Sequence, residues 1–153
     1  MRLRLVCVSR RPAPWVADAG QEYLRRLKGQ LDVEVREIAP AQAANPAQQK
    51  IREGEAVLKA ATGATLVALD ERGAQWSTRE FADALARWRD ARAHVVFAIG
   101  GAEGHADAVR AHAAATWSLS RLTLPHQLAR VLVIEQIYRA WSLLNNHPYH
   151  REG

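Results

Sequence analysis

The sequence contains almost no cysteine and no long apolar run. Its single cysteine, Cys7, excludes an internal disulfide framework and a cysteine-rich metal site. No apolar run approaches the roughly 20 residues that a membrane-spanning helix needs, and the N-terminus lacks the apolar stretch of a signal peptide. We therefore expect a cytoplasmic protein in which Cys7, inside an apolar strand-like run, is buried and unreactive.

Length and composition indicate one ordinary globular domain. The chain has 153 residues, of which 48% are hydrophobic and 24% charged, so we expect a single domain over residues 1–153. The net charge of +5 is concentrated in residues 1–30, where basic side chains outnumber acidic ones. Such a face would attract a polyanion such as RNA, although a solvated surface explains the charge equally well.

Strand and helix patterns alternate along the chain and predict an α/β fold. The most apolar strand-like runs, within 65–70 and 95–100, are typical of a parallel sheet that is covered on both faces. A predicted helix follows every predicted strand, and this alternation favours an open parallel sheet. The predicted strands are 2–9, 33–38, 65–70, 95–100 and, more weakly, 116–120; the predicted helices are 14–27, 45–61, 77–88, 106–115 and 125–144.

Two segments at the ends of predicted strands are candidates for ligand binding. The glycine-rich segment 100–104 follows the most apolar strand, and ligands of open α/β sheets bind beyond the carboxyl ends of the strands. It matches neither a dinucleotide fingerprint nor a phosphate-binding P-loop. The alternating segment 119–126 could enclose a flat ring, or it could simply connect a strand to a helix.

Other polar groups allow two interpretations each. Asp70 and Glu71 could form an acid pair for proton transfer, or they could form a turn neutralised by Arg72. The tail 146–152 could fray, or its aromatic, imidazole and guanidinium groups could bind an unpaired base. No cluster of ligands completes a metal site, so we expect none. The last helix carries more apolar surface than one face requires, which suggests either burial or a second subunit.

Taken in order, the motifs closely resemble the ribosomal RNA large-subunit methyltransferase H family. The resemblance extends over the whole chain and includes the glycine segment and residues 117–120. It is strongest in four C-terminal motifs: Thr123-Leu124-Pro125-His126, residues 130–136, Tyr138-Arg139-Ala140-Trp141-Ser142, and His147-Pro148-Tyr149-His150-Arg151-Glu152.

This resemblance implies a SPOUT-type parallel-sheet α/β fold with a C-terminal deep trefoil knot, which no periodicity argument could have found. It also implies methylation of N3 of a pseudouridine in 23S rRNA, with S-adenosylmethionine as methyl donor. The residues that would hold this cofactor, largely through backbone groups, are Leu69, Gly100, Leu119, Ser120, Arg121, Leu122, Thr123 and Leu124.

The resemblance further implies a homodimer whose site lies near the interface. The side chains that would hold or orient the target base are His126, Arg139, Tyr149, His150 and Arg151, with the tail contributed by the other subunit. A neutral His126 or His150 could accept the N3 proton, unless the proton leaves directly to water. Arg139 or Arg151 could stabilise the negative charge on the base.

Two positions depart from the family pattern, and two other functions stay open. Ala102 stands where the family often has proline, and Gln127 replaces a more usual apolar residue or proline. Neither change removes a group that the chemistry needs. The alternatives are a SPOUT methyltransferase that acts on transfer RNA and a non-catalytic, ribosome-associated RNA-binding protein.

Overall fold

The computed structural model describes residues 1–152 and contains one five-stranded, all-parallel sheet. Its strand order is β2-β1-β4-β3-β5, which confirms the predicted α/β fold with a parallel sheet. Along the chain the elements are β1 (Arg2–Val8), α1 (Pro14–Leu27), β2 (Asp32–Ile38), α2 (Pro46–Ala60), β3 (Thr65–Ala74), α3 (Thr78–Asp90), β4 (His94–Ile99), α4 (Asp107–His112), β5 (Ala115–Trp117), α5 (His126–Leu144) and the 3₁₀ helix η1 (Pro148–Glu152).

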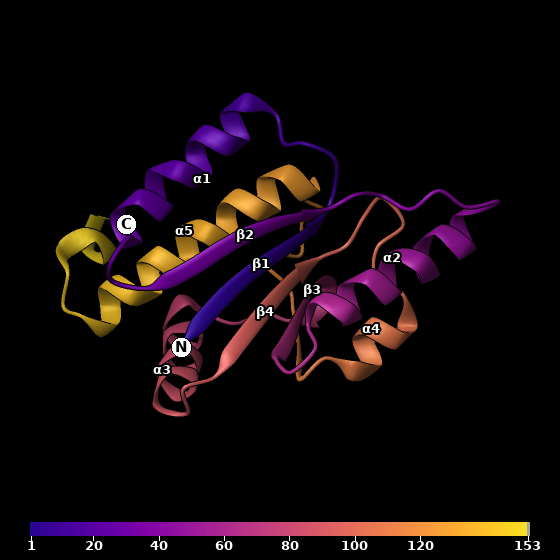
Figure 1. Cartoon of the computed structure of the whole chain (residues 1–153). Coiled ribbons are helices and arrows are strands. Elements are labelled where there is room, and N and C mark those ends of the chain that lie inside the picture. The colour runs from indigo at the N-terminus through magenta and orange to yellow at the C-terminus, as the bar shows by residue number, and fades with distance from the viewer. Residues whose placement is uncertain (153) are drawn as a thin grey trace.

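Helices cover both faces of the sheet, as Figure 1 shows. The long helix α5 packs between α1 and α3 on one face, and α2 and α4 pack together on the other. Strand β1 serves both layers because successive side chains point to opposite faces. Its Leu3, Leu5 and Cys7 belong to the core under α5, and Val6 and Val8 belong to the core under α2.

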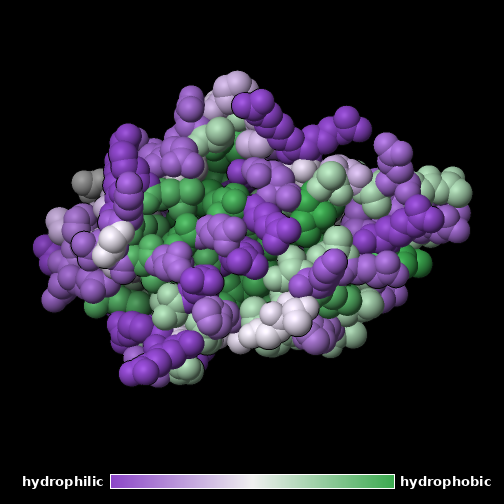
Figure 2. Space-filling view, in the orientation of Figure 1, coloured by the Kyte–Doolittle hydropathy of each residue, from purple (hydrophilic) through white to green (hydrophobic). Residues whose placement is uncertain are grey.

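The helix-start signals of the sequence operate as predicted. Asn45 caps α2 by accepting a hydrogen bond from the Gln48 amide at 2.9 Å, and Ser77 with Glu80 forms the reciprocal capping box of α3. The surface seen in Figure 2 is hydrophilic over much of its outline, with hydrophobic residues visible between the charged groups. Within residues 1–152, none of the helices is long and apolar enough to cross a membrane.

Three predicted boundaries are wrong. Strand β3 continues to Ala74 through a bulge instead of ending at Asp70. Strand β5 ends at Trp117 rather than residue 120. This end has a local cause, because the Ser118 hydroxyl donates to the Ser120 carbonyl and the Ser120 hydroxyl accepts from the Leu122 amide, both at 2.9 Å. Such serine bonds favour a turn over a strand.

The third wrong boundary is that of α4, which was predicted over residues 106–115 and covers only Asp107–His112. The chain leaves the helix early because the Ala114 amide donates to the Leu66 carbonyl of β3 at 2.8 Å. The tail does not project as a frayed end but forms η1, which packs on α5.

Candidate cofactor cleft and substrate-binding groups

A cleft of about 640 Å³ opens at the carboxyl ends of β3, β4 and β5. It lies where the topology of an open parallel sheet places ligands, and its volume is typical of a small-molecule site. Three connections form its walls: the end of β3, the loop after β4, and the loop that leads into α5. The lining residues of these connections are Leu69–Arg72, Ile99–His105, Trp117, Leu119, Ser120 and Leu122–His126, joined by Arg110 and Ala129 from the helices.

The glycine loop after β4 leaves no space for a side chain at its first two positions. A Cβ atom at Gly100 would lie 2.9 Å from the backbone carbon of Gly104, and one at Gly101 would lie 2.8 Å from Glu53 Oε1. The loop closes on itself because the Gly104 amide donates to the Gly101 carbonyl at 3.0 Å. Gly104 has φ +75°, a conformation that glycine adopts without strain. At its glycines, the loop therefore presents bare backbone to the cleft.

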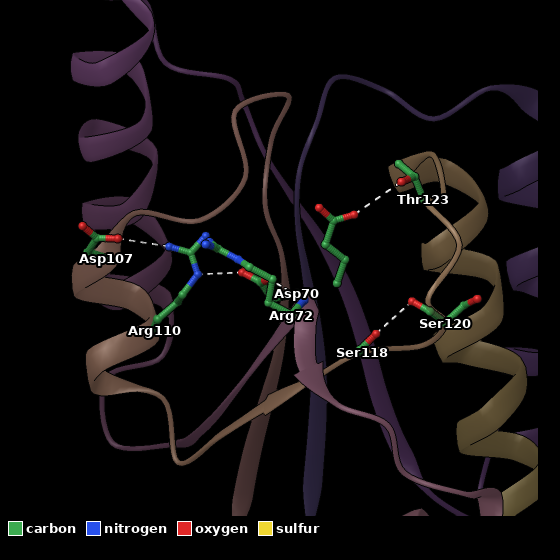
Figure 3. Close-up of polar contacts among 8 residues, drawn as sticks. Asp70, Arg72, Asp107, Arg110, Ser118, Ser120 and Thr123 are labelled. Carbon is green, nitrogen blue, oxygen red and sulfur yellow. Dashed lines mark hydrogen bonds and ion pairs between the residues drawn. The ribbon is translucent and has the colours of Figure 1, made fainter.

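The loop before α5 supplies the apolar wall. Leu119, Leu122 and Leu124 line the cleft, and Leu122 is 72% exposed. An apolar side chain this exposed beside a cleft is available to cover a flat ligand. The loop is anchored to the opposite wall through the Thr123 hydroxyl, which donates to Glu71 Oε2 at 3.4 Å across the cleft (Figure 3).

Asp70 is held by arginines and does not form an acid pair with Glu71. Its carboxylate receives Arg110 Nε at 2.6 Å and the Arg72 amide at 2.9 Å (Figure 3). Burial works to raise the pKa of Asp70, but these hydrogen bonds and positive charges outweigh it and hold the pKa below its usual value. Asp70 therefore stays ionised, which favours the turn interpretation over proton transfer.

His105 lies behind the glycine loop and is 3% exposed. Its Nε2 lies 3.0 Å from the Ala98 carbonyl, a contact that the N–H of a neutral ring can make. Burial lowers the pKa of His105. A neutral, buried imidazole of this kind braces the end of β4 and adds no charge to the cleft.

The structure brings most of the predicted cofactor residues together. Three widely separated segments meet in the cleft, and the predicted residues that line it are Leu69, Gly100, Leu119, Ser120, Leu122, Thr123 and Leu124. Arg121 belongs to the same loop, but its side chain is exposed and does not line the cleft. Of the residues predicted to bind the base, only His126 lines the cleft.

The other predicted base-binding residues lie near the far end of α5. Arg139 Nη2 pairs with Glu135 Oε1 at 2.8 Å, and the Tyr149 hydroxyl donates to the same oxygen at 2.9 Å. The Arg139 guanidinium lies over the Tyr149 ring, 5.0 Å from its centre. His150 Nδ1 lies 3.2 Å from the Ser142 hydroxyl, whereas Arg151 is exposed.

Electrostatics fix the protonation of this group. Burial, together with the hydrogen bond to Glu135, raises the pKa of Tyr149, so its hydroxyl remains a donor. Burial works to lower the pKa of Arg139, but the Glu135 carboxylate outweighs it and raises that pKa. A hollow of about 460 Å³ beside this group is lined by Thr78, Arg79, Gln136, Arg139, Leu143 and His150.

Glu135 organises these side chains, a role that its place in the motif 130–136 does not reveal. Its spacing of four residues from Arg139 on a helix is the signal that could have found it. Asp70 with Arg110 was also missed as a pair, because 40 residues separate them. Within residues 1–152, no group of three histidine, cysteine or acidic side chains is placed to hold a metal ion.

Comparisons with known proteins agree with this geometry. A family model described as a predicted SPOUT methyltransferase matches residues 1–150. A relative from Methylococcus capsulatus is 49% identical, and one from Polynucleobacter asymbioticus is 43% identical; each alignment covers 99% of this chain and 100% of the relative. A Pseudomonas aeruginosa relative is 47% identical with the same coverage. All three carry the name ribosomal RNA large subunit methyltransferase H.

A solved structure supports the fold independently. The probable methylase family protein from Haemophilus influenzae superposes with a TM-score of 0.60 at 14% identity, covering 96% of this chain and 69% of that one. At this identity the likeness concerns the fold alone. Together with the full-length sequence matches, it leads to one conclusion: the chain belongs to the ribosomal RNA large subunit methyltransferase H family of SPOUT methyltransferases.

Proposed function

We infer that this protein transfers a methyl group from S-adenosylmethionine to N3 of a pseudouridine in 23S rRNA. The observation that carries the inference is the meeting of three distant segments around one cleft, in a chain that matches these rRNA methyltransferases over its full length. We take residues 1–153 as one SPOUT domain that works in the cytoplasm, where ribosomes are. The deep trefoil knot of this fold is part of the proposal and is supported by the match of the family model to residues 1–150.

The residues of the cleft fit the cofactor. When bound, S-adenosylmethionine supplies a methyl group that is already activated by its sulfonium centre. The leucines of the loop before α5 offer an apolar surface for the flat heteroaromatic ring of the cofactor, and the backbone of Gly100 offers hydrogen-bonding groups at close approach. We propose that Leu69 and residues 119–124 hold the cofactor in this way, with Arg121 contributing through its backbone. The protein then contributes alignment and exclusion of water.

The base must meet His126 at the mouth of the cleft. His126 is the first residue of α5 and lines the cleft, so its imidazole is placed to accept the N3 proton of the target base. Arg139 lies 13 residues further along the same helix, which corresponds to roughly 20 Å along its axis. One base cannot contact both side chains of a single chain.

A second copy of the chain resolves this separation. Where two subunits pack isologously with their α5 helices antiparallel, each tail lies beside the His126 end of the other subunit. The surface where α1 meets α5 carries the apolar side chains that such an interface needs: Trp15 is 57% exposed and Leu128 is 36% exposed. We propose that Arg139, Tyr149, His150 and Arg151 act across this dimer.

A complementation experiment tests the composite site. H126A and Y149A variants are each expected to be inactive on ribosomes. If the sites form between subunits, mixed dimers contain one intact site, and random mixing restores about a quarter of wild-type turnover. A mixture that stays inactive, although mass measurement shows mixed dimers, would exclude a site shared between subunits.

The activity itself is tested on rRNA. A bacterial strain that lacks its own member of the family is complemented with this chain, and the 23S rRNA is analysed by mass spectrometry. We expect one methylated pseudouridine to reappear. Transfer to purified transfer RNA instead of ribosomes would favour the transfer-RNA alternative, and absence of cofactor binding in calorimetry would favour a non-catalytic RNA-binding protein.

A further inference from the structure

The basic N-terminal segment is mostly neutralised in the folded protein. Arg2 pairs with Asp32 and Arg4 with Glu34, each at 2.9 Å. Arg25 and Arg26 share the carboxylate of a single acid, at 2.7 and 2.6 Å. The charge excess of this segment therefore does not form one uniform basic face.

Two adjacent arginines remain without such a partner. Arg10 and Arg11 follow the carboxyl end of β1, and both are exposed. Within residues 1–151, neither side chain takes part in an ion pair or a side-chain hydrogen bond. Their charge is thus available to a partner outside the fold.

Their position brings this charge to the cleft. The strands are all parallel, so the end of β1 lies at the same edge of the sheet as the ends of β3 and β4. The loop from β1 to α1 passes beside the start of α5 (Figure 1) and is fixed there, because the Ala13 amide donates to Gln127 Oε1 at 2.9 Å. Gln127 follows His126, and Arg11 is only two residues, or at most about 7 Å of chain, from Ala13.

A third arginine lies on the loop that leads to His126. Arg121 is exposed, and its neighbours Ser120 and Leu122 line the cleft while its own side chain does not. Within residues 1–151, no ion pair involves Arg121. Arginines that flank the entrance to a base-binding site suit phosphate, because the guanidinium group binds phosphate oxygens in a bidentate manner.

We propose that Arg10, Arg11 and Arg121 bind backbone phosphates of the RNA next to the target nucleotide. This surface, the arginine rim, extends the proposed function by naming residues that dock the RNA, and it rests on that function. Phosphate contacts of this kind set register and orientation without reading sequence. The rim would hold the strand while the base enters the cleft beside His126.

The test compares an R10A/R11A variant, and separately R121A, with a K28A/R87A control. Lys28 and Arg87 are exposed cations near the opposite, amino edge of the sheet, so the double control removes as much charge as R10A/R11A, and R87A alone matches R121A. We measure KM for ribosomes, kcat, affinity for S-adenosylmethionine, and the salt dependence of ribosome binding. For R10A/R11A we expect KM to rise about tenfold or more, and the slope of log K against log salt to fall by about 1–2.

Other outcomes separate the possibilities. An R10K/R11K variant should recover most of the binding, because it keeps the charge. If R10A/R11A binds ribosomes no worse than K28A/R87A, the arginine rim does not contact phosphate. If R10A/R11A loses binding without a change in the salt slope, the rim contacts a protein partner instead of phosphate. Lost cofactor affinity or lower thermal stability in the variant would make the role structural. A wild-type protein that methylates no rRNA would instead refute the proposed function.

Discussion

Substitution of Gly100 by alanine should damage the cofactor cleft more than the fold. A Cβ atom there would lie 2.9 Å from the Gly104 carbonyl carbon and 3.1 Å from both the Gly104 oxygen and the His105 nitrogen. These are backbone atoms of a closed turn, so they cannot rotate away as a side chain would. Overpacking of this kind costs about 1–3 kcal/mol, which corresponds to a fall in Tm of roughly 2–12 °C for a domain of this size.

The binding effect should exceed this general loss, because the glycine loop that must move also lines the cleft. We expect affinity for S-adenosylmethionine, measured by calorimetry below the Tm, to fall about tenfold or more. The matched control is Gly29→Ala, where φ is +80° and no atom lies within 4 Å of the new Cβ. It should lose about 1–2 kcal/mol of stability from backbone strain while keeping normal affinity. Wild-type affinity in G100A would refute the assignment of this loop to the cofactor.

Three further predictions concern titratable and reactive groups. An H126A/H150A variant should lose kcat by about 100-fold or more without abolishing cofactor binding, if histidine removes the proton; unchanged turnover in a single-turnover assay would retire that role. Asp70→Asn should cost about 1–3 kcal/mol at neutral pH. Because folding lowers the Asp70 pKa from 3.8, the difference in unfolding free energy is present above 3.8. It should shrink as the pH falls from 3.8 through the lower pKa of the folded state in denaturant titrations; a constant difference would contradict the Arg110 pairing. Burial raises the pKa of Cys7 to about 12, so iodoacetamide should modify it only in unfolded protein, and rapid native labelling would oppose this burial.

Patterns of burial made most of the architecture predictable. The apolar runs that become β3 and β4 are covered by helices on both faces, and the caps at Asn45 and Ser77 depend on local sequence alone. The short strand β5 was harder to delimit, because its end is determined by hydroxyl bonds at Ser118 and Ser120 that hydrophobic periodicity does not record. The bulge that extends β3 likewise depends on pairing of Ala74 with Trp117, a contact between distant segments.

The candidate site could be predicted only in part from the residues themselves. From the residues alone, the glycine segment 100–104 and the segment 119–126 are candidate binding segments, because ligands of open parallel sheets bind at the strand ends. The resemblance to the family supplied Leu69 and the individual residues of the loop before α5. The separation of Arg139 from His126 already follows from the single helix predicted over 125–144, and the structure confirms that helix as His126–Leu144. That separation is the physical reason for invoking a second subunit.

Hydrogen exchange in the presence and absence of S-adenosylmethionine tests most directly whether the cofactor binds in this cleft. Backbone amides become protected where a ligand covers or rigidifies them. Protection should be concentrated in residues 69–72, 100–105 and 119–126, the three segments that line the cleft. Protection that spares all three segments and appears elsewhere, for example beside the hollow at Arg139, would contradict a cofactor site at the carboxyl edge of the sheet.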